Sequence, residues 1–372
     1  MHKQLLVDAL DDALENGTFN KAVMVQKAAN VCCFGLGTYF REAFASKHIK
    51  ETWHVNLLSD NDSGKWGKSF EGIPCIPPTE LTQYKDLMVI LLLGDPRPVE
   101  RQLDQLGIRH VTHVDLSIDD ELGFTKDREE FAKMRPKFLA AYDLFEDEDS
   151  KRVYVNAIVN RISPTRSVVT WADLCVEGEY FYQKFMNDNS GGVFIDCGAW
   201  TGDTIKGFSD SVGGKYERIH AFELDEKNFM TLKRNTEGMH DVVLHHAGVG
   251  ERTGIVAYGK GTGDNEPTSG ISILKAGTGE AGHADIVRLD DALANEKVTF
   301  IKMDIEGYET AALRGAGEIM RLQKPQLAVC VYHRTSDFWE VPFLIHEANP
   351  EYKLYLRHHY DRNAWGTVLY AV

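Results

Sequence analysis

The stretch FIDCGAWTGDT at residues 194–204 carries the residue types of a small-ligand site. An apolar run enters it, and Gly198 and Gly202 would let the backbone approach a ligand closely. Loops of this shape usually hold phosphate at a helix N-terminus. This one contains Asp196 and Asp203 and neither Lys nor Arg, so its charge opposes a diphosphate. We therefore expect a ligand that is not a polyanion.

S-adenosylmethionine fits this charge pattern, because it carries a sulfonium and an ammonium against one carboxylate and has no phosphate. Glu223 follows the next strand-like run, where an acid can accept hydrogen bonds from both ribose hydroxyls. An NAD site would share that acid, and each carboxylate taken alone could instead cap a helix or face solvent. The residues predicted to bind this cofactor, and its product S-adenosylhomocysteine, are Asp196, Gly198, Ala199, Gly202, Asp203, Glu223 and His246.

A second set of titratable residues, Asp304, Glu306 and His333, is predicted to be catalytic. Methyl transfer to a hydroxyl requires removal of its proton, and His333 is the preferred base because an imidazole titrates near neutral pH. His333 could instead be a hydrogen-bonded histidine at a strand end. Asp304 and Glu306 could hold a divalent metal such as Mg²⁺. The pair could equally begin the helix near Gly307, so a metal is not favoured and none is assigned.

These residues fall at the ends of strand-like runs that alternate with helix-like segments in two series. Such alternation predicts parallel sheets with crossover helices, and ligands bind beyond the carboxyl ends of the strands. The first series has strand-like runs at residues 28–34, 53–59, 87–93 and 110–116. The second has them at residues 193–197, 218–222, 242–246, 299–305, 326–332, 352–357 and 367–372. The closeness of the last two predicts a hairpin, and so one antiparallel strand.

The two series predict an α/β protein with two Rossmann-like domains. We place the N-terminal, nucleotide-binding-like domain at residues 1–125 and the C-terminal domain at residues 191–372, with a helical linker over residues 126–190. An acidic run at residues 140–151 marks the boundary region.

The first domain carries a weaker nucleotide signal. Gly35 and Gly37 follow its first strand-like run, but Phe40 stands where the dinucleotide fingerprint has a small residue. Asp60 follows the next run, at the distance of a ribose-binding acid. Residues 59–81 resemble nucleotide-binding-like domains found in surface-polysaccharide enzymes. Three alternatives stay open for this domain. It binds a nucleotide, it binds a nucleotide sugar, or it is a degenerate domain that binds substrate or a second subunit.

Composition excludes several classes of protein. With 43% hydrophobic and 26% charged residues, the chain has the composition of an ordinary globular protein. The formal net charge of −15 opposes nucleic acid, whose binding depends on Lys and Arg at the phosphates. The N-terminus has no signal-peptide core, the longest apolar run is too short to span a bilayer, and the six cysteines lack zinc or redox spacing. We expect a cytoplasmic protein with reduced thiols and with no nucleic-acid or membrane partner.

The second series also resembles the FkbM family of S-adenosylmethionine-dependent methyltransferases over residues 193–372. The resemblance is carried by DCGAWTGDT at 196–204, AFELDEKNF at 221–229 and FIKMDIEGYETAALRGA at 300–316. It implies a methyltransferase-type, mostly parallel seven-stranded sheet, with the cofactor over the carboxyl ends of the first two strands. It also implies that the glycine loop binds the cofactor and that Glu223 binds its ribose. Trp200 departs from the smaller or amide residue expected at that place.

Family members are associated mainly with O-methylation, often of sugars or polyketide hydroxyls. The resemblance therefore implies S-adenosylmethionine-dependent O-methylation of a sugar or polysaccharide precursor, with a small molecule or a glycan as acceptor. Whether the chain forms a homo-oligomer stays open. Two alternatives are an NAD(P)-dependent oxidoreductase that acts through the N-terminal domain, and a binding protein that keeps a methyltransferase fold without activity.

Overall fold

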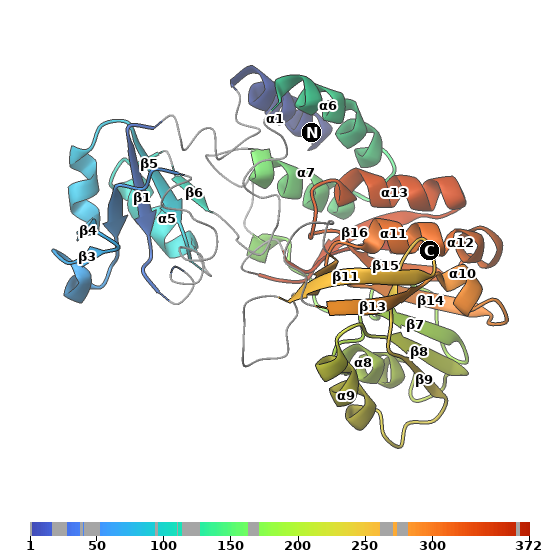
Figure 1. Ribbon diagram of the computed structural model, residues 1–372. Coiled ribbons are helices and arrows are strands. Elements are labelled where there is room, and N and C mark those ends of the chain that lie inside the picture. The colour runs from blue at the N-terminus through green and yellow to red at the C-terminus, as the bar shows by residue number, and fades with distance from the viewer. Residues whose placement is uncertain are drawn as a thin grey trace. The chain divides into compact units, whose positions relative to one another are not determined.

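The computed structural model describes residues 2–16, 28–37, 40, 53–93, 96–109, 111–113, 127–162, 171–260, 271–273, 282–361 and 365–372. The chain forms two compact units (Figure 1). The first unit contains residues 1–142, 151–175 and 360–365, and the second contains residues 143–150, 176–359 and 366–372. The chain passes between the units more than once, so neither is a single continuous segment.

The first unit contains a six-stranded sheet in the order β3-β4-β2-β1-β5-β6, and every pairing is parallel except that of β3 with β4. The strands are β1 (Asn30–Phe34), β2 (Leu57–Ser59), β3 (Ser69–Phe70), β4 (Ile73–Ile76), β5 (Leu87–Leu91) and β6 (Val111–His113). Its helices include α1 (His2–Asn16), α5 (Arg97–Gln105), α6 (Arg128–Tyr142) and most of α7 (Glu148–Ile162). Val31 and Cys33 enter one buried cluster while Cys32 and Phe34 enter another. Burial of both faces explains why β1 reads as a continuous apolar run.

The second unit contains a seven-stranded sheet in the order β16-β17-β15-β14-β7-β8-β9. Its strands are β7 (Val193–Cys197), β8 (Arg218–Phe222), β9 (Val242–His245), β14 (Val298–Met303), β15 (Gln326–Cys330), β16 (Leu354–His358) and β17 (Thr367–Ala371). Only β17 runs antiparallel to its neighbours. The predicted fold, a mostly parallel seven-stranded sheet with one antiparallel strand from a hairpin, is confirmed.

Helices cover this sheet. They are α8 (Asp203–Ser211), α9 (Glu226–Asn235), α10 (Leu289–Ala292), α11 (Glu309–Gly315), α12 (Gly317–Gln323) and α13 (Asp337–Ala348). Figure 1 shows α8 and α9 beside β7 to β9, and α10 to α13 grouped near β14 and β15. None of the helices described is both long and apolar enough to cross a bilayer.

A second, smaller sheet of the second unit was not predicted. It has the order β10-β13-β11-β12, with β10 (Gly248–Val249), β11 (Gly254–Lys260), β12 (Ile271–Ile273) and β13 (Gly282–Val287). The residues of β13 alternate between partly or fully buried and exposed over most of its length. The sequence between β9 and β14 therefore lacks the long apolar runs by which the parallel strands were found.

An aromatic cluster packs against the first half of β7 and β14. The rings of Phe194 on β7 and Phe208 on α8 stack with centroids 4.3 Å apart. Phe181, which precedes β7, packs edge-on against Phe194 and Phe300 at 5.7 Å. Residues from the segment predicted as a linker thus belong to the core that positions the glycine loop.

Candidate active site

The glycine loop joins β7 to α8 and rests against both neighbouring strands. The N–H groups of Gly198 and Ala199 both donate to the carbonyl oxygen of Phe222 on β8, at 3.0 Å. Gly198 has φ +80°, and a Cβ there would collide with the carbonyl oxygen of Asp304 after β14. Gly202, at φ +92°, precedes the first residue of α8. Both positions require glycine because the left-handed backbone and the close approach exclude a side chain.

Asp196 lies under this loop and not on its surface. Its side chain is fully buried, Thr204 Oγ1 donates to Oδ2 at 2.6 Å, and Lys302 Nζ lies 3.1 Å from Oδ1. Burial raises the pKa of Asp196, while the Lys302 charge opposes that rise. Lys302 Nζ also donates to the carbonyl of Gly198 at 2.8 Å. Lys302 of β14 therefore compensates the charge of Asp196, although the loop itself contains no Lys or Arg.

The other loop carboxylate, Asp203, is exposed at the first residue of α8, where negative charge complements the helix dipole. It is the carboxylate that gives the accessible side of the loop its negative charge.

Glu223 ties the loop to the end of β8. The N–H groups of Trp200 and Asp225 donate to its two carboxylate oxygens at 2.9 and 2.8 Å. Burial raises the pKa of Glu223 to about 7, although the backbone donors oppose this. The side chain of Asn228 also donates to this carboxylate. Three donors leave one of its four lone-pair positions, which can accept from a ribose hydroxyl. The Trp200 side chain is 38% exposed, so it is not a core aromatic.

The remaining predicted cofactor residue, His246, follows β9 and is exposed. Its ring stacks on Phe229 of α9, with centroids 4.7 Å apart. Because β7, β8 and β9 are parallel neighbours, His246 lies on the same edge of the sheet as the loop and Glu223.

Asp304 lies on this edge at the end of β14, beside β7 and β15. Its carboxylate accepts hydrogen bonds from the hydroxyls of Tyr180 at 3.3 Å and Tyr332 at 3.2 Å, and its side chain stays 27% exposed. Sequence reasoning missed Tyr180 because it comes from the segment predicted as a linker.

His333, at the end of β15, is buried among carboxylates. Its Nδ1 lies 3.0 Å from Glu309 Oε1, and its Nε2 lies 3.5 Å from both Asp304 Oδ1 and Glu306 Oε2. Burial alone would lower the pKa of His333, but the three carboxylates outweigh it and raise the pKa to about 10. At neutral pH the ring therefore carries both protons and has no lone pair to accept another. This argues against the prediction that His333 is the general base.

Glu309, also missed, is fully buried at the start of α11, where its Oε1 accepts the N–H of Ile305 at 2.9 Å. The sequence feature that could have identified Glu309 is a glutamate on the apolar side of a short helix.

Glu179 is a further titratable residue that the sequence did not single out. Its side chain keeps contact with solvent, but enough protein surrounds the carboxylate to desolvate it. That desolvation and the charge of Asp304 raise the pKa of Glu179 to about 7, while Lys302 opposes the rise. Glu179 thus stands beside Tyr180 with a pKa suited to proton transfer near neutral pH.

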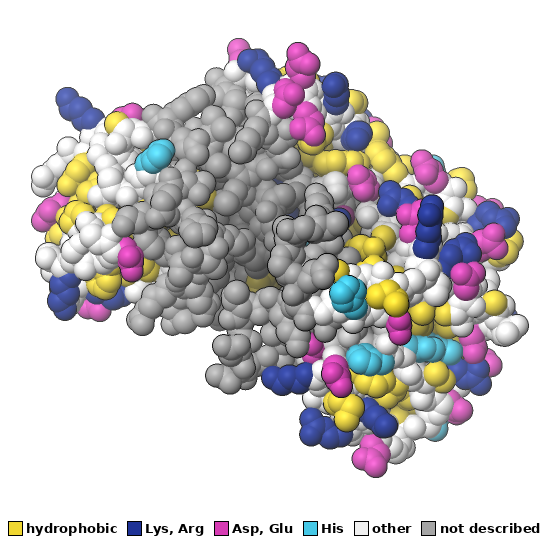
Figure 2. Space-filling model, viewed as in Figure 1, with side chains coloured by type: hydrophobic (Ala, Val, Ile, Leu, Met, Phe, Trp, Pro, Cys, Tyr) yellow, Lys and Arg dark blue, Asp and Glu magenta, His cyan; other side chains and the backbone are white. Residues whose placement is uncertain are grey.

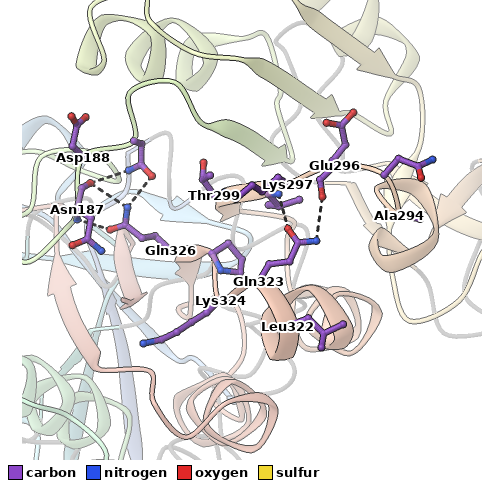
Figure 3. A pocket seen from close by; sticks show the side chains of 14 residues that line it. Asn187, Asp188, Ala294, Glu296, Lys297, Thr299, Leu322, Gln323, Lys324 and Gln326 are labelled. Carbon is purple, nitrogen blue, oxygen red and sulfur yellow. Dashed lines mark hydrogen bonds between the residues drawn. The ribbon is translucent and has the colours of Figure 1, made fainter.

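An open pocket of about 620 Å³ lies at the opposite edge of the sheet (Figure 3). Its walls include Val298 and Gln326, the first residues of β14 and β15, and none of the predicted site residues. Ligands of parallel sheets bind at the carboxyl edge, so we assign no function to this pocket.

The first unit also has an acid at the end of a strand, but this acid is already bonded to other groups of the protein. Asp60, at the end of β2, accepts the N–H of Leu36 at 2.6 Å and pairs with Lys65 Nζ at 2.8 Å. Lys65 also donates to the carbonyl of Leu36. The predicted ribose acid is thus engaged by the loop after β1 and by a lysine.

Sheet order, glycine loop and Glu223 together define an α/β protein of the methyltransferase class. Residues 196–362 match the family model described as the methyltransferase FkbM domain. This match confirms the predicted resemblance to the FkbM methyltransferase family for residues 196–362. A search of curated proteins finds no match.

The fold recurs in a solved methyltransferase structure. The chain is similar to methyltransferase FkbM from Methylobacillus flagellatus KT, at 21% identity and a TM-score of 0.73, over 100% of this chain and 99% of that one. Fibrillarin from Aeropyrum pernix, in complex with natively bound S-adenosyl-L-methionine, matches at 12% identity and a TM-score of 0.33, over 51% and 70%. A SAM dependent methyltransferase from Aquifex aeolicus matches at 16% identity and a TM-score of 0.28, over 50% and 84%.

Proposed function

We propose that the second unit transfers the methyl group of S-adenosylmethionine to a hydroxyl of a sugar or polysaccharide precursor. The cofactor assignment rests on the loop at Gly198. In this loop the N–H of Trp200 donates a hydrogen bond to the buried acid Glu223. A close backbone approach beside a carboxylate that can accept a ribose hydroxyl, together with the exposed charge of Asp203, supports binding of a cationic nucleoside ligand.

In this reaction a lone pair of the acceptor oxygen forms the O–C bond while the C–S bond breaks. The electrons of that bond stay on sulfur, so the sulfonium becomes the neutral thioether of S-adenosylhomocysteine. Alignment of the acceptor with the methyl group can supply up to about 7–11 kcal/mol of the barrier reduction.

The acceptor proton must go to a base, and we assign that role to Glu179. It lies next to Tyr180, whose hydroxyl bonds Asp304, and the negative charge of Asp304 favours the protonated form of Glu179. Asp304 and Glu306 then lie on the acceptor side of the site. The choice of a sugar or glycan as acceptor rests on what the FkbM family is associated with.

Thermal unfolding in the presence of S-adenosylhomocysteine or NAD tests the cofactor assignment. A ligand at a hundredfold excess over its Kd adds about 2.7 kcal/mol to the stability of the native state. We expect S-adenosylhomocysteine to raise Tm and NAD to leave it unchanged. A rise with NAD alone would favour the oxidoreductase alternative and contradict the proposal.

Turnover of Glu179→Gln tests the base. Loss of a general base lowers kcat by about 10²–10⁴-fold, and we expect this loss with unchanged affinity for S-adenosylhomocysteine. Glu177→Gln, a change at an exposed neighbour, is the matched control. Methyl transfer from labelled cofactor onto a panel of glycans and small hydroxyl compounds supplies the readout.

A further inference from the structure

The two ring nitrogens of His333 have different surroundings. Nδ1 points to the fully buried Glu309, at 3.0 Å from Oε1. Nε2 points the other way, toward the partly exposed carboxylates of Asp304 and Glu306. A histidine held at one nitrogen by a buried carboxylate is the arrangement by which proteins orient an imidazole toward a metal ion.

The distances around Nε2 do not describe hydrogen bonds. Nε2 is buried, makes no hydrogen bond, and lies 3.5 Å from both Asp304 Oδ1 and Glu306 Oε2. Hydrogen bonds between charged N–H groups and carboxylates are shorter, about 2.7–2.9 Å. Ligand atoms of a tetrahedral ion with bonds of about 2.0–2.1 Å are about 3.4 Å apart. Each of the two distances from Nε2 therefore suits a pair of ligands of one cation.

We propose that His333 Nε2, Asp304 Oδ1 and Glu306 Oε2 form a binding site for a divalent cation, with Glu309 as the residue that positions His333. Ligand atoms of Asp304, Glu309 and His333 lie within 4.8 Å of one another, so the Asp304 carboxylate is close to the His333–Glu309 pair. The side chains of Asp304 and Glu306 are 27% and 37% exposed, so a cation can enter from solvent and keep a coordination position for a further oxygen.

The donor set selects the class of cation. One imidazole with carboxylates suits Mn²⁺, Fe²⁺ or Zn²⁺, whereas Mg²⁺ prefers oxygen ligands alone. The sequence prediction weighed a metal on Asp304 and Glu306 only, and so considered Mg²⁺. The structure adds the nitrogen ligand and its buried carboxylate, because it brings the ends of β14 and β15 together.

The site would serve the acceptor side of the reaction and in that respect rests on the proposed function. A hydroxyl that occupies the open coordination position loses its proton more readily and is held near the methyl donor. His333, either protonated or bound to a cation, has no free lone pair, in agreement with its exclusion as the base.

Binding of Mn²⁺ to the full chain, after removal of metals with EDTA, tests the proposal without an activity assay. Electron paramagnetic resonance of free Mn²⁺ gives the affinity and the number of ions bound. We expect one ion per chain, and we expect His333→Gln and Asp304→Asn to abolish its binding. Glu309→Gln should weaken binding by about 10–100-fold, as loss of an orienting partner does. His240→Gln is the matched control, since His240 has a carboxylate oxygen of Asp241 at 3.1 Å but is exposed.

Glu306→Gln guards against loss of fold, because this side chain is the most exposed of the three ligands. We expect it to weaken Mn²⁺ binding while Tm in EDTA stays at the wild-type value. Absence of Mn²⁺ and Zn²⁺ binding to the wild-type chain would overturn the proposal, as would equal binding by the wild type and folded Glu306→Gln. S-adenosylhomocysteine binding, measured on the same samples, separates this outcome from failure of the proposed function.

Discussion

At Gly198 the glycine loop comes close to the backbone carbonyl of Asp304, which follows β14. We expect Gly198→Ala to abolish S-adenosylhomocysteine binding and to destabilise the fold more than Gly191→Ala does. Both glycines have positive φ, which costs another residue about 1–3 kcal/mol. Only at Gly198 would the added Cβ also collide with the Asp304 carbonyl, while at Gly191 it meets nothing within 4 Å. Denaturant unfolding of the two variants measures the difference, and equal losses would contradict the prediction.

The raised pKa of Glu223 leads us to expect that cofactor binding depends on pH. Burial raises its pKa to about 7, so the ionised carboxylate becomes the main form only above neutral pH. An ionised acceptor binds hydroxyl donors more strongly than the neutral acid. We therefore expect the affinity for S-adenosylhomocysteine to rise between pH 6 and pH 8, by at most about tenfold per pH unit below the pKa. Calorimetric titration checks this, and Glu223→Gln should bind weakly with a flat pH profile.

At the scale of elements, β14 stabilises the loop that follows β7. Lys302 is the register partner of Asp196 on the neighbouring strand, so the two side chains emerge side by side on one face. Both are almost completely buried, and the cation reaches Asp196 and the Gly198 carbonyl together. Burial lowers the pKa of Lys302, but the negative charges of Asp196 and Asp304 raise it by a larger amount. The ammonium therefore keeps its proton.

Lys302→Met should therefore lower the free energy of unfolding by about 3–5 kcal/mol, because it leaves a buried carboxylate without its counter-ion. The double variant Asp196→Asn/Lys302→Met removes both charges and should recover part of this loss. Chemical denaturation of the wild type, both single variants and the double variant gives the coupling energy. Additive effects of the two substitutions would show that the ion pair does not hold the loop.

At the scale of the whole molecule, each unit contains a sheet in which a glycine loop and an acid lie at the carboxyl ends of adjacent strands. In the second unit the acid, Glu223, has backbone and Asn228 donors and no cation among the residues that the structure describes. In the first unit Asp60 is instead paired with Lys65. Figure 2 shows basic and acidic side chains interspersed over the visible surface of the described residues. Similarity to the Methylobacillus flagellatus protein extends over the whole chain, so both units recur together in that fold.

Much of this fold could be predicted from the sequence. The strand-like runs at residues 193–197 and 218–222 are buried strands, because a parallel strand covered on both faces must be continuously apolar. Gly198 and Glu223 could be found because glycine at a strand end and an acid at the next one mark a ligand loop. The small sheet containing β11 and β13 could not be predicted, because its half-exposed strands are not continuously apolar.

Only the tertiary structure decided the charge states in the site. Asp196 looked like an exposed anion until the register of β7 and β14 placed Lys302 beside it. His333 looked like a base until the packing of α11 and β14 surrounded it with three carboxylates. The sequence by itself determined which strands form and where a ligand can approach the backbone, because local apolarity and glycine act through neighbours along the chain. Protonation depends on distances between residues far apart in the sequence, and only folding sets those distances.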